Sequence, residues 1–163
     1  MPQWLETAFA WLQSTAVGEA VRGTPFLYPT LESIHIVGIA LLIGPAFAFD
    51  LRLLGVGRRL VSVTTAARSL LPVSHVGLAV ALLTGVALFS AQTTVVAGSA
   101  AAPWKLGLLL VAGLNVLVFH RGAYRRVEDW AEASPPPAAL VAAGLSLIAW
   151  TGVVFAGRFL AYT

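Results

Sequence analysis

The chain has 163 residues, of which 58% are hydrophobic and only 10% are charged, and its mean hydropathy is +0.86. A soluble globular protein of this length needs more polar surface, so the composition excludes that class and predicts a protein embedded in lipid. The chain also contains no cysteine, which excludes disulfides, iron–sulfur clusters, thiolate metal sites and covalently attached c-type haem.

The first predicted element is a short amphipathic helix at residues 2–14. Trp4, Phe9 and Trp11 recur there at helical spacing, and Glu6 and Gln13 lie on the opposite face. The segment is too short to cross a bilayer, so we expect it to lie at the membrane interface with its tryptophans at head-group level. We do not expect a cleavable signal peptide, because no basic segment precedes the apolar residues.

Four longer apolar runs follow, and each is long enough to cross the ~30 Å hydrocarbon core of a bilayer as a helix. We predict membrane spans at residues 31–51, 72–90, 104–120 and 138–157. The prediction is therefore one membrane domain over residues 1–163. Its fold class is all-α: an integral membrane four-helix bundle with an N-terminal interfacial amphipathic helix.

Three connections of different composition join the spans. Between the first two spans we expect a separate surface helix that starts at Thr64 or Thr65, with Pro72 opening the second span at a helix N1 position. Residues 91–103 and 121–137 are expected to be loops. These connections leave the four spans as the body of the protein.

The basic residues predict the orientation. The first-to-second and third-to-fourth connections hold seven arginines, whereas three basic residues lie on the opposite side. Because Lys and Arg are enriched in cytoplasmic loops, we expect both termini on the periplasmic side of a bacterial inner membrane. Charges spread over loops argue against a nucleic-acid partner and leave the bilayer as the expected one. The seven are Arg52, Arg58, Arg59, Arg68, Arg121, Arg125 and Arg126; the three are Arg22, Lys105 and Arg158.

Ionisable residues inside the spans fall into two layers by depth. Glu32 and His35 lie near the start of the first span, Lys105 begins the third, and Arg158 ends the fourth, which places all four near the outer side. We expect Glu32 to pair with Arg158 or Lys105, and His35, one helical turn away, to join them by a hydrogen bond. Such pairing neutralises Glu32 within the outer layer.

The cytoplasmic-side layer contains Asp50, His75, His120 and Arg121, with Asn115 about 7 Å deeper along its helix. Two histidines at one depth on different helices are what bis-imidazole ligation of haem requires. We therefore predict haem b with His75 and His120 as axial ligands and Arg121 near its propionates. His35 lies roughly 18 Å from that level, so it would ligate a second haem, pair with a symmetry mate in a homo-oligomer, or bind a quinone.

Some of these residues also have a purely structural interpretation. Asp50 and Arg52 are expected to form an ion pair at the helix end. Asn115 is a candidate for a hydrogen bond between two membrane helices. Gly38 and Gly44 predict close approach of a neighbouring helix to the first span.

The function predicted from these residues is electron transfer by a membrane-embedded haem b protein with a redox partner; if the chain is enzymatic, it is a component of a membrane oxidoreductase. One alternative is an oligomeric transporter, channel or copper-handling protein that uses Glu32, His35 and Arg158, with His35, His75 and His120 as possible metal ligands. A second alternative is a structural accessory subunit. Glu32 and His35 have the spacing of di-iron bundles, but no second such pair occurs.

Four motifs are distributed along the chain: Tyr28-Pro29-x-x-Glu32-x-x-His35-x-x-Gly38, Asp50 to Gly55 (DLRLLG), Ala112-Gly113-Leu114-Asn115 with Phe119-His120, and Gly157-Arg158-x-x-Ala161-Tyr162. In this combination the sequence resembles an uncharacterised bacterial family of small four-helix membrane proteins. The resemblance implies the four-helix fold and singles out Glu32, His35, Asn115, His120 and Arg158, but it implies no activity. More loosely, the chain is similar to b-type cytochromes and copper-resistance membrane domains.

Overall fold

The computed structural model describes residues 3–130, 134–160 and 162. Residue 2, where the predicted interfacial helix begins, and residue 161 of the last motif lie outside them. The described chain is helical and contains no strand. Its helices, in order, are α1 (Gln3–Gln13), α2 (Ala16–Gly23), α3 (Leu27–Leu53), α4 (Val63–Ala91), α5 (Thr93–Gly98), α6 (Ala102–Arg121), the 3₁₀ helix η1 (Ala123–Arg126), α7 (Val127–Trp130) and α8 (Pro137–Phe159).

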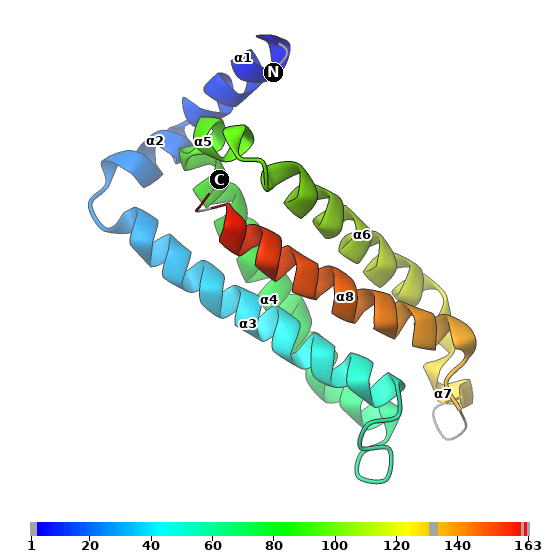
Figure 1. Cartoon of the computed structure of the whole chain (residues 1–163). Helices are drawn as coiled ribbons and strands as arrows, with labels where there is room; N and C mark the ends of the chain where they lie inside the picture. The colour runs from blue at the N-terminus through cyan, green and yellow to red at the C-terminus, as the bar shows by residue number, and fades with distance from the viewer. Residues whose placement is uncertain (1–2, 131–133, 161, 163) are drawn as a thin grey trace.

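Four helices, α3, α4, α6 and α8, are long and apolar enough to cross a membrane. They run side by side and alternate in direction (Figure 1). The predicted all-α bundle with four membrane-length helices is therefore confirmed. The boundaries differ by a few residues; α3, for example, starts at Leu27 rather than at residue 31 and carries Pro29 in its first turn, where proline is tolerated.

The two ends of the bundle differ. One end, called the terminal end here, carries α1, α2, α5 and the C-terminal end of α8; the other, the loop end, carries the α3–α4 connection, η1 and α7 (Figure 1). Side chains hold the short helices at the terminal end, since Thr94 donates from Oγ1 to Gln13 Oε1 at 2.8 Å and Arg22 donates to the Ala91 carbonyl at 3.1 Å. Every residue of α1 is at least partly exposed. The position of α1 at a membrane interface stays a prediction.

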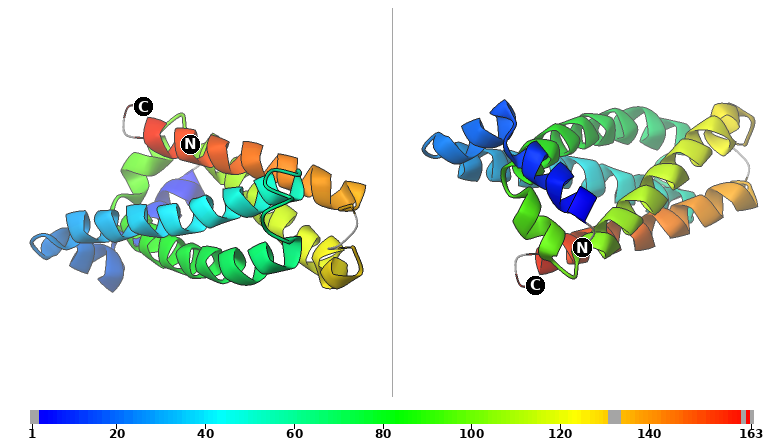
Figure 2. Two further views of the ribbon diagram at one scale, coloured as in Figure 1. Left: turned by 90° about the horizontal axis from the view of Figure 1, so that it is seen from below. Right: turned by 90° about the horizontal axis from the view of Figure 1, so that it is seen from above.

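The four long helices form two hairpins (Figure 2). The first pairs α3 with α4 and the second pairs α6 with α8, and the hairpins meet where α3 packs against α8. The backbones of α4 and α6, both described over their full lengths, do not come into contact. The side of the bundle between α4 and α6 is therefore spanned by side chains alone.

Helices α3 and α4 approach each other closely because small residues face each other. A Cβ atom on Gly77 would lie 2.3 Å from the Leu42 nitrogen, and one on Gly38 would lie 2.9 Å from the Ala81 nitrogen. Gly38 therefore acts as predicted. The prediction for Gly44 is wrong, because no described atom of a neighbouring helix lies within 4 Å of the position its Cβ would take.

The prediction of a separate surface helix before Pro72 is also wrong. Helix α4 runs without interruption from Val63 to Ala91, with Pro72 inside it, and the Ser62 side chain caps its start by accepting from the Thr65 nitrogen. A proline costs a backbone hydrogen bond, but membrane helices tolerate it where neighbouring helices support the chain. The two predicted loops also contain helices: residues 91–103 contain α5, and residues 121–137 contain η1 and α7.

Candidate functional site

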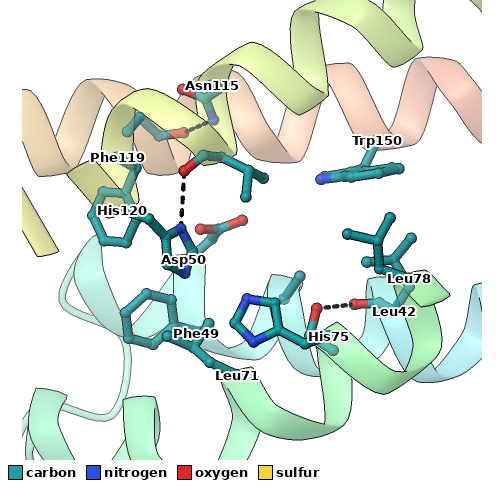
Figure 3. Close-up of a pocket in the computed structure, with 14 residues that line it drawn as sticks. Leu42, Phe49, Asp50, Leu71, His75, Leu78, Asn115, Phe119, His120 and Trp150 are labelled. Atoms are coloured by element: carbon teal, nitrogen blue, oxygen red, sulfur yellow. Dashed lines mark hydrogen bonds between the residues drawn. The ribbon is translucent and has the colours of Figure 1, made fainter. Parts of the chain in front are cut away.

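A small cavity lies between the four long helices, in the half of the bundle nearer the loop end (Figure 3). Its volume is about 50 Å³, and all four long helices contribute to its wall. Most of the wall is apolar or aromatic, including Phe49, Phe119 and Trp150. The cavity has room for a few water molecules or a single ion. Its polar side chains are Asp50, Ser74, His75, Asn115 and His120.

His75 of α4 and His120 of α6 face each other at this cavity. Their ring centroids are 5.3 Å apart and the ring planes are inclined by 58°. The equal depth predicted from the sequence is therefore confirmed. Because the backbones of α4 and α6 stay apart, these two rings bridge the open side of the bundle (Figure 3).

The orientation of the His120 ring follows from its hydrogen bond. Nδ1 lies 2.9 Å from the Val116 carbonyl oxygen, which only accepts, so Nδ1 carries the proton. Nε2 then presents a lone pair, and this atom is buried and has no hydrogen-bond partner within the described part of the chain. A histidine that donates one ring N–H to a backbone carbonyl and keeps the other nitrogen free has the form of a metal ligand.

Asp50 lines the same cavity. It is only 7% exposed, and its Oδ2 atom has no hydrogen-bond partner among the described residues. The Ser146 hydroxyl of α8 lies close enough to interact with the carboxyl group. The predicted ion pair with Arg52 is wrong, since Arg52 donates to the Val61 carbonyl instead. Two residues along a helix turn the side chain by about 200°, so Arg52 points away from the bundle interior.

Asn115 lines the cavity and Arg121 ends the same helix, but neither belongs to the histidine pair. The Asn115 side chain donates from Nδ2 to the Ala142 carbonyl at 2.9 Å, which joins α6 to α8 as its structural interpretation predicted. Arg121 is exposed at the end of α6, close in sequence to the exposed Arg125 and Arg126 of η1. These arginines are positioned to meet anionic groups at the loop end.

His35 belongs to another level of the bundle. Its Nδ1 atom lies 2.9 Å from Thr84 Oγ1 of α4. Thr84 is nine residues from His75, or about 14 Å along the helix axis. A cluster of Leu42, Ala112, Ala149 and Trp150 forms an apolar layer in between. His35 therefore lies apart from His75 and His120. This agrees with the prediction from depth.

The predicted pairing of Glu32 with Lys105 or Arg158 is wrong. Within residues 3–130, 134–160 and 162, the only ion pair joins the exposed side chains of Arg68 and Glu128, 3.6 Å apart. Arg158 instead interacts with a residue beyond the C-terminal end of α8: it donates to the Tyr162 hydroxyl and lies 4.9 Å from that ring's centroid. Glu32, Lys105 and Arg158 lie at the same end of the bundle, as their equal depth predicted. Their side chains leave the helices in different directions, so they form no ion pairs with one another.

The described residues bring together no group of three or more His, Cys, Asp or Glu side chains that could hold a metal ion. Haem needs only two protein ligands, because its macrocycle supplies the other four donors. The donor chemistry of His75 and His120 therefore fits haem. The cavity of about 50 Å³ is far smaller than a porphyrin, so binding a macrocycle would require α4 and α6, whose backbones are not in contact, to move apart.

Comparisons of the chain with protein-family models, curated proteins and solved structures give no match. The resemblance to a family of four-helix membrane proteins rests on the sequence motifs and stays a prediction.

Four residues at these sites were missed from the sequence: Ser74, Thr84, Gly85 and Ser146. Gly77, Thr84 and Gly85 lie on one face of α4, seven and eight residues apart, a spacing that would have shown a small-residue stripe. Ser146 gives no comparable signal, because one serine in an apolar helix is common.

Proposed function

We propose that the protein is a membrane-embedded haem b protein that transfers electrons, with His75 and His120 as the axial ligands. One observation carries the proposal: the His120 ring is fixed by its Nδ1 bond to the Val116 carbonyl, and its buried Nε2 lies beside the facing ring of His75. An imidazole with a free lone pair and a second imidazole opposite it are the two axial ligands that a six-coordinate haem requires.

The walls of the site support the same function. An iron with two axial imidazoles has no open coordination position, so such a haem exchanges electrons rather than activating a substrate. Phe49, Phe119 and Trp150 keep the surroundings apolar, which limits water around the two histidines. Arg121, with Arg125 and Arg126, supplies cations for propionates at the loop end.

The location is part of the proposal. Four membrane-length helices favour an integral membrane protein. The seven arginines counted above are on loop-end segments, so we place the loop end, and the histidine pair nearest to it, on the cytoplasmic side of a bacterial inner membrane. Both termini then lie on the periplasmic side.

Expression in a haem-sufficient bacterial host tests the proposal. The protein purified in mild detergent is expected to show a Soret band and a pyridine haemochromogen of haem b at about one haem per chain. His120→Ala and His75→Ala are expected to lose at least nine-tenths of that haem. His35→Ala is the matched control, since it removes a histidine from the other level and is expected to keep its haem. Purified protein without haem, or equal loss in the control, would contradict the proposal.

A second candidate function is proton or ion handling at the same cavity. It is favoured by Asp50 Oδ2 and His120 Nε2, two buried atoms that lack hydrogen-bond partners in the described chain and line a space of water size. The outer group of Glu32, His35 and Arg158, which the sequence suggested for transport, is not held together by ion pairs among the described residues. Proton uptake into vesicles that Asp50→Asn abolishes, in protein without haem, would support this candidate.

A further inference from the structure

The connection between α3 and α4, residues 54–62, carries exposed apolar and cationic side chains next to each other. It projects from the loop end of the bundle (Figure 1). Arg58 and Arg59 are exposed, and Leu60 beside them is 86% exposed. Apolar side chains that gather on a surface beside charged ones mark a site of interaction. The exposed large apolar residues of the connection are Leu54, Val56, Leu60 and Val61.

The backbone of this connection is held by hydrogen bonds. Helix α3 ends in a Schellman motif, in which the Val56 nitrogen donates to the Leu51 carbonyl at 2.9 Å. The second bond of the motif joins the Gly55 nitrogen to the Arg52 carbonyl at 3.2 Å, and Gly55 has a φ of +100°, which glycine adopts without strain. The Arg52 side chain also donates to the Val61 carbonyl, which closes the connection at its base. The exposed side chains therefore extend from fixed backbone positions.

No carboxylate balances the arginines of the connection. Residues 51–68 contain four arginines and no Asp or Glu. Arg68, the last of the four, pairs with Glu128, but Arg58 and Arg59 form no ion pair with any residue that the structure describes. Two adjacent guanidinium groups are therefore available to an anion. Guanidinium binds phosphate oxygens especially well, because two of its N–H groups donate in parallel.

Helix length places the connection at the level of lipid head groups. Helix α3 has 27 residues, which corresponds to a length of about 40 Å. The hydrocarbon core of a bilayer is about 30 Å thick, and the bilayer with its head groups is about 40–45 Å thick. In the proposed membrane location, the end of α3 therefore lies in the layer where lipid phosphates meet the upper parts of the acyl chains.

The two kinds of side chain define the chemistry of the occupant. A soluble phosphate pairs with the arginines but leaves Leu60 and Val56 uncovered. A zwitterionic lipid covers these apolar side chains, but its own cation competes with the arginines for its phosphate. An acidic phospholipid satisfies both requirements, because its net negative charge attracts basic residues near the membrane surface and its acyl chains cover the apolar ones.

We propose that Arg58, Arg59 and Leu60 form a binding site for acidic phospholipids of the surrounding leaflet. The two guanidinium groups bind the lipid phosphate, and the Leu60 side chain contacts the first part of the acyl chains. The site rests on the proposed membrane location. It does not depend on haem, because no residue of the connection lines the cavity that His75 and His120 share.

Native mass spectrometry of the full chain in mild detergent tests the site. The probes are dioleoyl phosphatidylglycerol and dioleoyl phosphatidylcholine, which have the same acyl chains and differ in head-group charge. We expect a dissociation constant for phosphatidylglycerol that is at least five-fold lower, since each basic residue near the surface contributes to the attraction. Inorganic phosphate and polyglutamate, at the same concentration of charge, represent a free anion and an acidic protein surface.

Paired substitutions test whether the site is local. Arg58→Gln combined with Arg59→Gln is expected to bring the affinities for the two lipids within two-fold of each other. The matched control is Arg125→Gln combined with Arg126→Gln, which removes the same charge from the same end. Residues 122–130, all of which the structure describes, include no exposed large apolar side chain. We therefore expect the control to keep the lipid preference of the wild-type protein within two-fold.

Two further variants separate the apolar and the cationic contributions. Leu60→Ser is expected to weaken the binding of both lipids about three-fold, because it removes only the apolar contact. Arg58→Lys combined with Arg59→Lys keeps the charge but loses the paired donors, so we expect two- to five-fold weaker binding of phosphatidylglycerol. Circular dichroism checks that each variant keeps its helices, as expected for changes in a connection between them.

The outcomes separate this inference from the proposed function. Loss of the lipid preference in the Arg58 and Arg59 variant alone supports the inference, and the same result is expected in His120→Ala protein without haem. Equal binding of the two lipids by the folded wild-type protein would overturn it. Equal loss in both arginine pairs would overturn it too, because it indicates general attraction to the loop end. Tighter binding of inorganic phosphate or polyglutamate than of phosphatidylglycerol would point to a soluble anion or an acidic protein instead.

Discussion

The two polar levels of the bundle use the same residue type in different ways. At the loop-end level, His75 and His120 reach across an opening and meet at a cavity that also holds the buried carboxyl group of Asp50. At the terminal-end level, His35 is pressed into the neighbouring helix and bonded to Thr84. The difference follows from helix packing: α3 and α4 are in close contact, whereas α4 and α6 stay apart.

This contrast teaches that depth alone does not assign a role to an intramembrane histidine. A histidine in a tight helix pair is immobilised by its neighbours, as His35 is by Thr84 and Gly85. Two histidines on helices that stay apart, such as α4 and α6, can bind a larger group between them. Substitutions that change one level and spare the other therefore test the comparison.

The largest effect on stability is expected from closing the space between α3 and α4. In Gly77→Val, the added Cβ would lie 2.3 Å from the Leu42 nitrogen, and backbone cannot move aside easily. We expect a loss of about 3 kcal/mol in the free energy of unfolding, measured by titration with a denaturing detergent. Gly44→Val is the control, because the described chain leaves space there. Equal loss in both variants would show that the two helices are not held by close contact.

A smaller effect is expected from the charge at the loop-end level. Removing the buried carboxylate in Asp50→Asn favours the reduced, less positive iron, so the haem midpoint potential should rise, on the order of 50 mV. Potentiometric titration of the purified protein measures it. Glu32→Gln changes an exposed carboxylate at the other level and should leave the potential within a few millivolts. A shift of similar size in both variants would argue against a haem beside Asp50.

The smallest effects are expected from single hydrogen bonds, one at each level. Asn115→Ala removes the bond to the Ala142 carbonyl, and Thr84→Val removes the bond to His35. Each should lower the free energy of unfolding by about 0.6 kcal/mol, the average for such bonds between membrane helices. Haem content should stay unchanged in both. Loss of haem in Asn115→Ala would mean that Asn115 belongs to the cofactor site itself.

Much of the fold follows from the sequence because hydrophobic length is a strong signal. Each of the four spans was located to within a few residues, apart from the start of α4. There, Pro72 suggested a helix start, although the packing of a membrane bundle supports a proline inside a helix. The 1.5 Å rise per residue also predicted correctly that His75 and His120 share a level and that His35 lies apart from it.

The partners of the charged residues could not be predicted in the same way. Depth says nothing about the direction in which a side chain leaves its helix, and this direction separates Asp50 from Arg52 and Glu32 from Arg158. The contact of His35 with Thr84 depends on the register of α3 against α4, which Gly38 and Gly77 set by close approach. The register depends on both helices at once, so the sequence of either helix alone does not predict it.

The central claim is that His75 and His120 ligate one haem, and the spin state of the bound iron tests it most directly. Low-temperature electron paramagnetic resonance of the oxidised wild-type protein should show low-spin iron with two imidazole ligands. His75→Ala should convert any haem that it retains to a high-spin form, whereas His35→Ala should keep the low-spin signal. High-spin haem in the wild-type protein, or a low-spin signal that survives in His75→Ala and disappears in His35→Ala, would contradict the claim.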